Sequence, residues 1–262
     1  MPLVALHDDP LALKRGRSAP VSVVFRSGRR GPRNGSRIWL FDLDNTLHDA
    51  SGATFGPLNR AMTDFIAAAL SLTHEEADHL RRHYWQRYGA TLLGLARHHG
   101  VAPAHFLHHT HQLPGLEKRL RGSCADRAAL ARLPGRKIVL TNAPLAYARR
   151  VLDVLRIAHH FEAVVSIERM HMFGHLRPKP DTRMLRFVCA RLRARPSHCV
   201  LVEDTLEHQR AAWSVGMRTV WMRRYTRSAE AITITPKVGV HPCGRPPYVY
   251  ARISALRFLR AL

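Results

Sequence analysis

The stretch Phe41-Asp42-Leu43-Asp44-Asn45-Thr46-Leu47, directly after the apolar residues Ile38-Trp39-Leu40, decides the fold. An apolar run followed by polar residues is typical of a buried parallel strand that ends in a loop, and ligands of open α/β sheets gather at such carboxyl ends. Asp42 and Asp44 stand two positions apart, so both side chains point the same way. Two like charges in one small volume need a cation or a shared proton. The stretch predicts metal-assisted chemistry on an oxyanion, with an acidic surface loop as the alternative.

A regular alternation of strands and helices occupies the second half of the chain. Apolar runs predict strands at 137–140, 163–167, 198–202 and 218–222. Helical spacing predicts helices at 144–155, 182–192 and 205–215, the first opened by Pro144 and the last closed by Gly216. Strands separated by helices of this length imply right-handed crossovers. We therefore predict an α/β fold with a doubly wound, Rossmann-like parallel sheet.

A purely helical segment interrupts this alternation after the first strand. Apolar residues recur at helical spacing from Thr54 to about Leu113, and Thr73 with Glu76 forms a capping box. Prolines at 103 and 114 punctuate the segment. We read it as a small inserted cap. The predicted division is a basic, disordered tail at 1–36, a catalytic core at 37–47 plus 119–262, and a helical cap at 48–118.

Composition narrows the class of protein. The 262 residues are 46% hydrophobic, enough for one sizeable core and a smaller satellite, and no apolar run approaches a membrane span. The net charge of +22 raises nucleic-acid binding as a candidate. Because the arginines are spread along the chain and are not interleaved with aromatic residues, we expect no specific nucleic-acid partner. Four cysteines without paired short spacing argue against a disulfide framework and favour the cytoplasm.

Two further segments leave alternatives open. The arginine-rich, acid-poor tail has the composition of a targeting signal, but without the apolar stretch of a secretory one we favour a plain leader. The histidines at 98, 99, 105, 108, 109 and 111 include a recurrence every third residue. A zinc site there would need a further ligand from another element, and none is marked. We expect these histidines to be surface or packing residues of the cap.

Polar residues follow four of the predicted elements, where a doubly wound sheet brings them to one edge. After Asp42 and Asp44 come a hydroxyl with an amide, a loop lysine, and a second acidic pair: Thr141, Asn142, Lys179, Glu203 and Asp204. A nucleophile, a cation and paired acids suit a phosphate monoester with a divalent metal. Oxygen ligands favour Mg²⁺. We expect the metal at Asp42, Asp44, Glu203 and Asp204.

With these four motifs in this order, the chain resembles the haloacid dehalogenase superfamily from about Arg37 to Met222. The resemblance implies that Asp42 attacks phosphorus to form an aspartyl-phosphate and that Asp44 protonates the leaving oxygen and then activates water. It also implies that Thr141, Asn142 and Lys179 hold the phosphoryl oxygens. Mg²⁺ would be held by Asp42, the Asp44 carbonyl and Asp204, with Glu203 bound directly or through water.

Longer stretches, including Tyr88-Gly89-Ala90-Thr91-Leu92 and Val139-Leu140-Thr141-Asn142-Ala143-Pro144, are similar to the pyrimidine 5′-nucleotidase branch. That similarity implies a pyrimidine nucleoside 5′-monophosphate as substrate, with cap residues Tyr88 and Thr91 as base or ribose contacts or as packing residues. His208 departs from the branch pattern, in which Asn or Asp is common, as does Gln112 after His111. Both changes predict altered affinity or preference with activity retained.

Two alternatives stay open. One is a promiscuous phosphatase of the same superfamily acting on a sugar phosphate, phosphoglycolate or flavin mononucleotide (FMN), because the cap sequence does not fix the pocket shape. The other is a non-catalytic, nucleic-acid-associated protein, suggested by the charge of +22. The favoured hypothesis is a cytoplasmic phosphatase, monomer or homodimer, that binds a small-molecule phosphomonoester.

Overall fold

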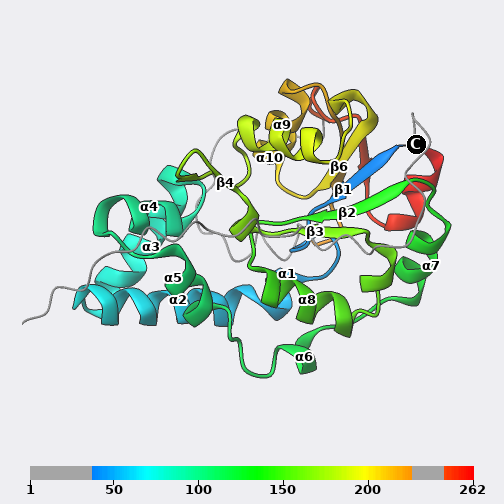
Figure 1. Ribbon diagram of the computed structural model, residues 1–262. Helices are drawn as coiled ribbons and strands as arrows, with labels where there is room; N and C mark the ends of the chain where they lie inside the picture. Colours follow the sequence, from blue (N-terminus) through cyan, green and yellow to red (C-terminus); the bar gives the residue numbers. More distant parts are fainter. Residues whose placement is uncertain (1–36, 226–244) are drawn as a thin grey trace, which may run out of the picture.

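A six-stranded parallel sheet organises the protein, whose computed structural model describes residues 37–225 and 245–262. The strand order is β3-β2-β1-β6-β7-β8, and every neighbouring pair is parallel (Figure 1). The strands are β1 (Ile38–Phe41), β2 (Arg136–Leu140), β3 (Ala163–Val165), β6 (Cys199–Glu203), β7 (Arg218–Met222) and β8 (Ala251–Ile253). The predicted fold class, an α/β doubly wound parallel sheet, is confirmed.

Strand β1 lies at the centre because all of its side chains are apolar and buried. Successive side chains point to opposite faces, so Trp39 and Phe41 enter one hydrophobic cluster while Ile38 and Leu40 enter another. Phe41 is in register with Val139 of β2 and with Val202 of β6. The carboxyl ends of these three strands are therefore level, and the residues after them share one edge.

Helices cover both faces of the sheet, with α9 and α10 above it in Figure 1 and α8 below it. The core helices are α7 (Cys124–Arg132), α8 (Leu145–Val154), α9 (Thr182–Arg191) and α10 (Leu206–Ser214). Asp181 caps α9 by accepting from the backbone N–H groups of Arg183 and Met184. Short 3-10 turns occupy Ala158–His160, Ile167–Arg169, Pro196–His198 and Leu256–Ala261.

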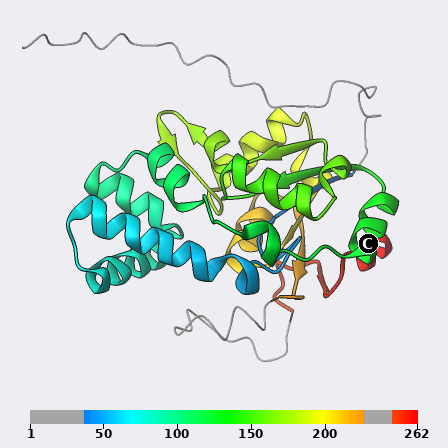
Figure 2. The ribbon, with the colours of Figure 1, turned by 90° about the horizontal axis from the view of Figure 1, so that it is seen from below.

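A separate group of helices lies to the left of the sheet in Figure 1 and is also seen from below in Figure 2. Its helices are α2 (Phe55–Leu70), α3 (His74–Tyr88), α4 (Thr91–His99) and α5 (Pro103–Thr110). Ile66, Leu95 and Phe106 are buried in its own hydrophobic cluster. Two short helices of the same segment, α1 (Ala50–Ala53) and α6 (Leu116–Arg119), lie below the sheet in Figure 1. Thr73 and Glu76 form the predicted capping box at the start of α3.

A β-hairpin contacts both the inserted helices and the core of the sheet domain. It consists of β4 (His171–Met172) and the antiparallel β5 (His175–Leu176). Leu176 packs against both the helical cluster and the core cluster on the α9 side, and nearby Ile167 lies inside the helical cluster. The helical insertion is thus attached to the core by apolar contacts as well as by the chain.

Three features differ from the sequence-based expectation. The strand predicted at 163–167 ends at Val165, because Ser166 leads into a 3-10 turn. The hairpin and β8 were not expected, since their strands have only two or three residues each. The predicted tail at 1–36 and most of the segment 233–247 lie outside the described residues. None of the helices described is both long and apolar enough to cross a bilayer.

Candidate active site

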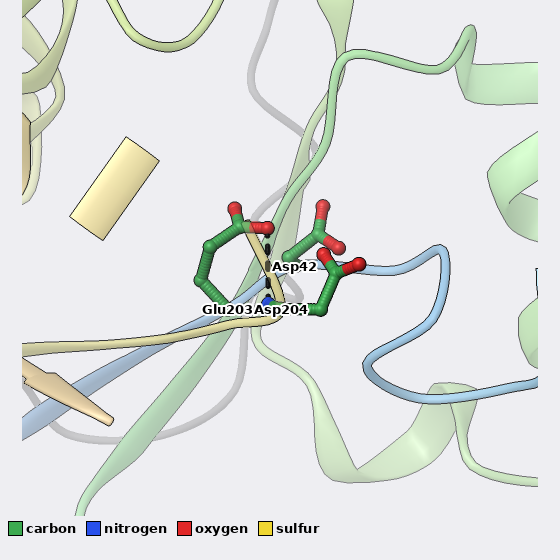
Figure 3. A group of neighbouring side chains, drawn as sticks. All are labelled: Asp42, Glu203 and Asp204. Atoms are coloured by element: carbon green, nitrogen blue, oxygen red, sulfur yellow. Dashed lines mark hydrogen bonds between the residues drawn. The ribbon is translucent and has the colours of Figure 1, made fainter. Parts of the chain in front are cut away.

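Three carboxylates meet where β1 and β6 end. Asp42 follows β1, Glu203 is the last residue of β6, and Asp204 follows it. Figure 3 shows their side chains gathered in one place, and one ligand oxygen from each lies within 4.8 Å of the others. The backbone N–H groups of Asp204 and Thr205 donate to Glu203 Oε1 at 3.2 and 3.1 Å, which fixes this carboxylate at the turn.

Lys179 brings a positive charge to the same place. Its side chain is 1% exposed, and Nζ donates to Asp42 Oδ1 at 2.6 Å and to Glu203 Oε2 at 2.8 Å. Asn142 holds the backbone of this lysine from both sides: its Nδ2 donates to the Lys179 carbonyl at 3.0 Å, and its Oδ1 accepts from the Lys179 N–H at 2.9 Å. Residues that are 137 positions apart therefore form one ion pair.

Burial and crowding set the protonation of the group. Burial, together with the charge of Glu203, raises the pKa of Asp42 to about 7 despite the attraction of Lys179. Burial and the same neighbour raise the pKa of Asp204 well above its usual value. Burial would also raise the pKa of Glu203, but Lys179 and His208 outweigh it and hold that pKa well below its usual range. One lysine cannot balance three carboxylates.

This donor set fits a divalent cation. Mg²⁺ is bound through oxygen ligands, usually one or two carboxylates, and it keeps several waters. Asp42, Glu203 and Asp204 supply such oxygens within 4.8 Å of one another, and a single ammonium group, that of Lys179, pairs with two of them. Among the residues that the structure describes, no other group of acidic, histidine or cysteine side chains is arranged in this way.

Asp44 lies apart from these three carboxylates. Its Oδ1 accepts from the Tyr147 hydroxyl at 2.7 Å and lies 2.9 Å from His48 Nε2. Burial would raise the pKa of Asp44, but these hydrogen bonds outweigh it and the pKa is lowered. Oδ1 of Asp44 is therefore directed to α8 and to the turn after β1, and Asp44 is not one of the three carboxylates grouped at the candidate metal site.

Thr141 and Asn142 follow β2, as expected from the sequence. Thr141 is 1% exposed, and its Oγ1 accepts from the Ala143 N–H at 3.0 Å. Its backbone N–H donates to the Val165 carbonyl on β3. Thr141 is thus set into the strand end, while Asn142 bonds to the lysine loop as described above.

The two cap candidates differ in their surroundings. Thr91 is buried, and its Oγ1 donates to the Arg81 carbonyl at 3.0 Å, an interaction that packs the cap. Tyr88 is half-buried, and its hydroxyl lies 2.6 Å from His98 Nε2. The next residue, Gly89, ends α3 with a positive φ of 77°, and a Cβ built there would lie 3.9 Å from Pro180 Cδ. The turn between α3 and α4 therefore reaches the loop that carries Lys179.

Sequence reasoning missed several side chains that hold the site together. Tyr147 and His48 bond to Asp44, and Trp221 Nε1 donates to the Asp204 carbonyl at 2.9 Å. His208, noted above for its departure from the branch pattern, places Nδ1 3.0 Å from Glu203 Oε2. No pattern in the sequence singled out His48, and an aromatic residue on a helix face, such as Tyr147, is typical of core packing.

The residues of this site lie within a segment that matches a known protein family. A family model described as a haloacid dehalogenase-like hydrolase matches residues 37–216, which contain every carboxylate and the lysine of the site. The chain belongs to this hydrolase family. The family resemblance expected from the four motifs is therefore confirmed.

Among curated proteins, this hydrolase is similar to Phosphate metabolism protein 8 of Saccharomyces cerevisiae, with 25% identity over 205 residues, or 71% of this chain. The match spans only 61% of the length of the yeast protein.

Solved structures share the fold. A HAD phosphatase from Thermococcus onnurineus has a TM-score of 0.56 at 18% identity, covering 86% of this chain and 96% of its own. The HAD hydrolase YfnB from Bacillus subtilis, bound to magnesium, has a TM-score of 0.52 at 15% identity over 86% of this chain and 97% of its own. L-2-haloacid dehalogenase from Xanthobacter autotrophicus has a TM-score of 0.50 at 16% identity over 87% of this chain and 98% of its own.

Proposed function

We propose that this hydrolase is a Mg²⁺-dependent phosphomonoesterase that works through an aspartyl-phosphate on Asp42. The observation that carries the proposal is the position of Lys179 Nζ, 2.6 Å from Asp42 Oδ1 and 2.8 Å from Glu203 Oε2. A buried cation beside a carboxylate nucleophile offsets the charge that would otherwise repel an approaching phosphate dianion. Burying a lysine with two carboxylates costs free energy of desolvation. A substrate contact on the protein surface would not need such an arrangement.

The proposed reaction has two displacements at phosphorus. An Asp42 oxygen attacks while the ester P–O bond breaks, and Asp44 gives its proton to the departing oxygen. Asp44 then takes a proton from water, whose oxygen displaces Asp42 and releases inorganic phosphate. Thr141, Asn142 and Lys179 are proposed to hold the phosphoryl oxygens.

Mg²⁺ would be held by Asp42, Glu203, Asp204 and the main chain of Asp44, and when bound it would neutralise charge on the phosphoryl oxygens.

The surroundings of Asp44 favour phosphoryl transfer over the dehalogenation named for one structural neighbour. Displacing a halide from carbon needs no leaving-group acid, whereas an alkoxide leaving a phosphate ester does. Asp44 is held in place by Tyr147 and His48, and its side chain is 22% exposed, so a leaving group could reach it.

A pyrimidine nucleoside 5′-monophosphate is the proposed substrate. The support is the similarity of the first loop and of the 88–92 segment to the pyrimidine 5′-nucleotidase branch, together with the approach of Gly89 to Pro180. Half-buried Tyr88 directly precedes Gly89 in the chain, and an aromatic ring near this turn would suit a nucleobase. A sugar phosphate, phosphoglycolate or FMN is the second candidate. We also propose a cytoplasmic location, because the cysteine spacing suits no disulfide framework. A monomer or homodimer is the proposed oligomeric state.

The test is release of inorganic phosphate by the full chain, with and without Mg²⁺, from UMP, CMP, glucose 6-phosphate, phosphoglycolate and FMN. We expect UMP or CMP to have the highest kcat/KM and chelation to abolish turnover. Asp42→Asn should lose activity by at least about 1000-fold, while Asp153→Asn, on the exposed side of α8, should not change it. A clear preference for a non-nucleotide would overturn the substrate assignment. Near-normal turnover by Asp42→Asn would overturn the covalent mechanism.

A further inference from the structure

A cavity of about 430 Å³ lies between α8 and β3, and none of the proposed active-site residues lines it. Strand β3 is the outermost strand on this side of the sheet, and α8 lies below it in Figure 1. Leu145, Arg149 and Leu152 line the cavity from α8 at helical spacing. A cavity of about 150 Å³ is enough to hold benzene, so this one has room for a larger organic molecule.

The inner wall of the cavity is apolar. Leu152, Phe161 and Ala163 line it and are 2%, 5% and 5% exposed. All three belong to the hydrophobic clusters that pack the two faces of the sheet. Because packing in the core fixes these side chains, the wall offers a preformed contact surface to an apolar group.

Arginine side chains line the outer part of the same cavity. Arg149 and Arg156 are both exposed, and within the part of the chain that the structure describes neither forms an ion pair. Arg169 adds a third guanidinium group. Arg156 follows the end of α8 with a φ of 57°, in the left-handed region where glycine or asparagine is usual after a helix. The chain thus carries an arginine at the cavity in a conformation that favours another residue.

Two carboxylates also line the cavity, but one of them is already paired. Glu162 accepts from Arg136 through both of its oxygens, at 2.7 and 2.8 Å. Asp153 therefore remains as the one lining carboxylate that could offset the three arginines. Positive charge beside an apolar wall favours a ligand with an anionic group at one end and an apolar body at the other.

We propose that this cavity is a second ligand site, which binds a small organic anion with an apolar body, such as an aromatic sulfonate, carboxylate or phosphate. The apolar body packs against Leu152 and Phe161, and the anionic group binds Arg149 and Arg156. Arginine suits this role because its paired N–H groups match the oxygens of such anions. A bare inorganic anion would leave the apolar wall in contact with water, and a neutral molecule would leave the arginines unpaired. The inference does not depend on the proposed phosphatase function.

The test is titration of the full chain with 8-anilinonaphthalene-1-sulfonate, an aromatic sulfonate whose fluorescence rises in an apolar site. The probe has no phosphoryl group, so a phosphatase cannot consume it. We expect one saturable site with a Kd on the order of 10–100 μM. Mg²⁺ with inorganic phosphate, which would occupy the proposed active site, should not displace the probe.

Matched variants locate the bound probe. Arg149→Gln combined with Arg156→Gln should raise Kd about 5- to 30-fold, because both charged contacts are lost. Arg186→Gln combined with Arg191→Gln removes the same charge from exposed positions of α9, on the opposite face of the sheet, and should change Kd less than about 2-fold. Ala158→Phe places a ring at a half-buried lining residue and should also raise Kd at least about 5-fold without a change of charge. Near-ultraviolet circular dichroism that matches the wild type shows that each variant is folded.

The possible results are distinct. Saturable binding that weakens only in the cavity variants supports the site. Equal weakening in both arginine pairs would show a general effect of charge and overturn the inference, as would the absence of binding at about 1 mM probe. Displacement by Mg²⁺ and phosphate would place the probe in the active site and also overturn it. Displacement by sodium sulfate at a concentration similar to that of the probe would overturn the need for an apolar body.

Discussion

Replacing Lys179 by methionine tests the buried charge balance directly. The substitution keeps the aliphatic stem but removes the ammonium group, whose hydrogen bonds reach Asp42 at 2.6 Å and Glu203 at 2.8 Å. Both carboxylates are almost fully buried and would lose their shared cation. Breaking a buried pair by removing one partner costs about 3–5 kcal/mol, so we expect the free energy of unfolding to fall by about this amount in the metal-free protein.

The loss of stability in Lys179→Met should grow as the pH rises. The pKa of Asp42 is about 7 with Lys179 present and rises further without it. A carboxyl whose folded pKa lies above its unfolded value binds more protons when folded, so stability falls as the pH rises toward the folded pKa. Relative to wild type, the variant should therefore lose a further ~1 kcal/mol between pH 7 and pH 8.5, and saturating Mg²⁺ should recover part of the loss.

The assay is urea unfolding of both proteins at pH 7 and 8.5, with and without Mg²⁺. Lys118→Met, an exposed lysine of α6, is the matched control and should change stability by less than about 0.5 kcal/mol. Phosphatase turnover of Lys179→Met should fall by at least about 100-fold. A loss of stability below about 1 kcal/mol that does not vary with pH or Mg²⁺ would refute the reasoning.

Three further predictions concern other groups. Burial lowers the pKa of His111 to about 4, so stability should fall by about 1–2 kcal/mol as the pH drops from 7.5 to 5, and His111→Gln should lose this pH dependence in urea titrations. Asp181→Ala removes the cap of α9 and should lower the thermal midpoint by a few degrees, about 1 kcal/mol, measured by circular dichroism; an unchanged midpoint would contradict the capping role. Added Mg²⁺ should raise the midpoint of the wild type but not of an Asp42→Asn, Asp204→Asn double variant; an equal rise in both would place the metal elsewhere.

Much of the fold could be predicted because local sequence patterns, such as apolar runs and capping residues, determine its elements. The strand at Ile38–Phe41 coincides with an apolar run because it is buried on both faces, and the strand at Arg218–Met222 has the predicted bounds. The capping box at Thr73 was readable for the same reason, because its interactions span only three residues. Strand β8 was not, because three residues in an alternating context carry too little signal.

Some residues of the site could be proposed from the sequence, and others could not. Asp42, Lys179 and Asp204 could be proposed from the sequence because the carboxyl ends of parallel strands meet at one edge, and the structure brings these residues together. The partners of Asp44 could not, because Tyr147 sits on an apolar helix face where a tyrosine usually packs in the core. Thr91 was a candidate substrate contact, but its hydroxyl donates a hydrogen bond to the Arg81 carbonyl. A sequence does not show that a polar side chain already has such a partner within the protein.

Strand β8 lies beyond the segment matched by the family model, which ends at residue 216, and it is the outermost strand next to β7. The turn that follows it, Leu256–Ala261, packs against α7. A truncated protein ending soon after Met222 would expose the backbone donors and acceptors of β7, which could then pair with strands of other chains. We therefore expect shortened variants to self-associate even with every proposed site residue intact, because β8 no longer covers the edge of β7.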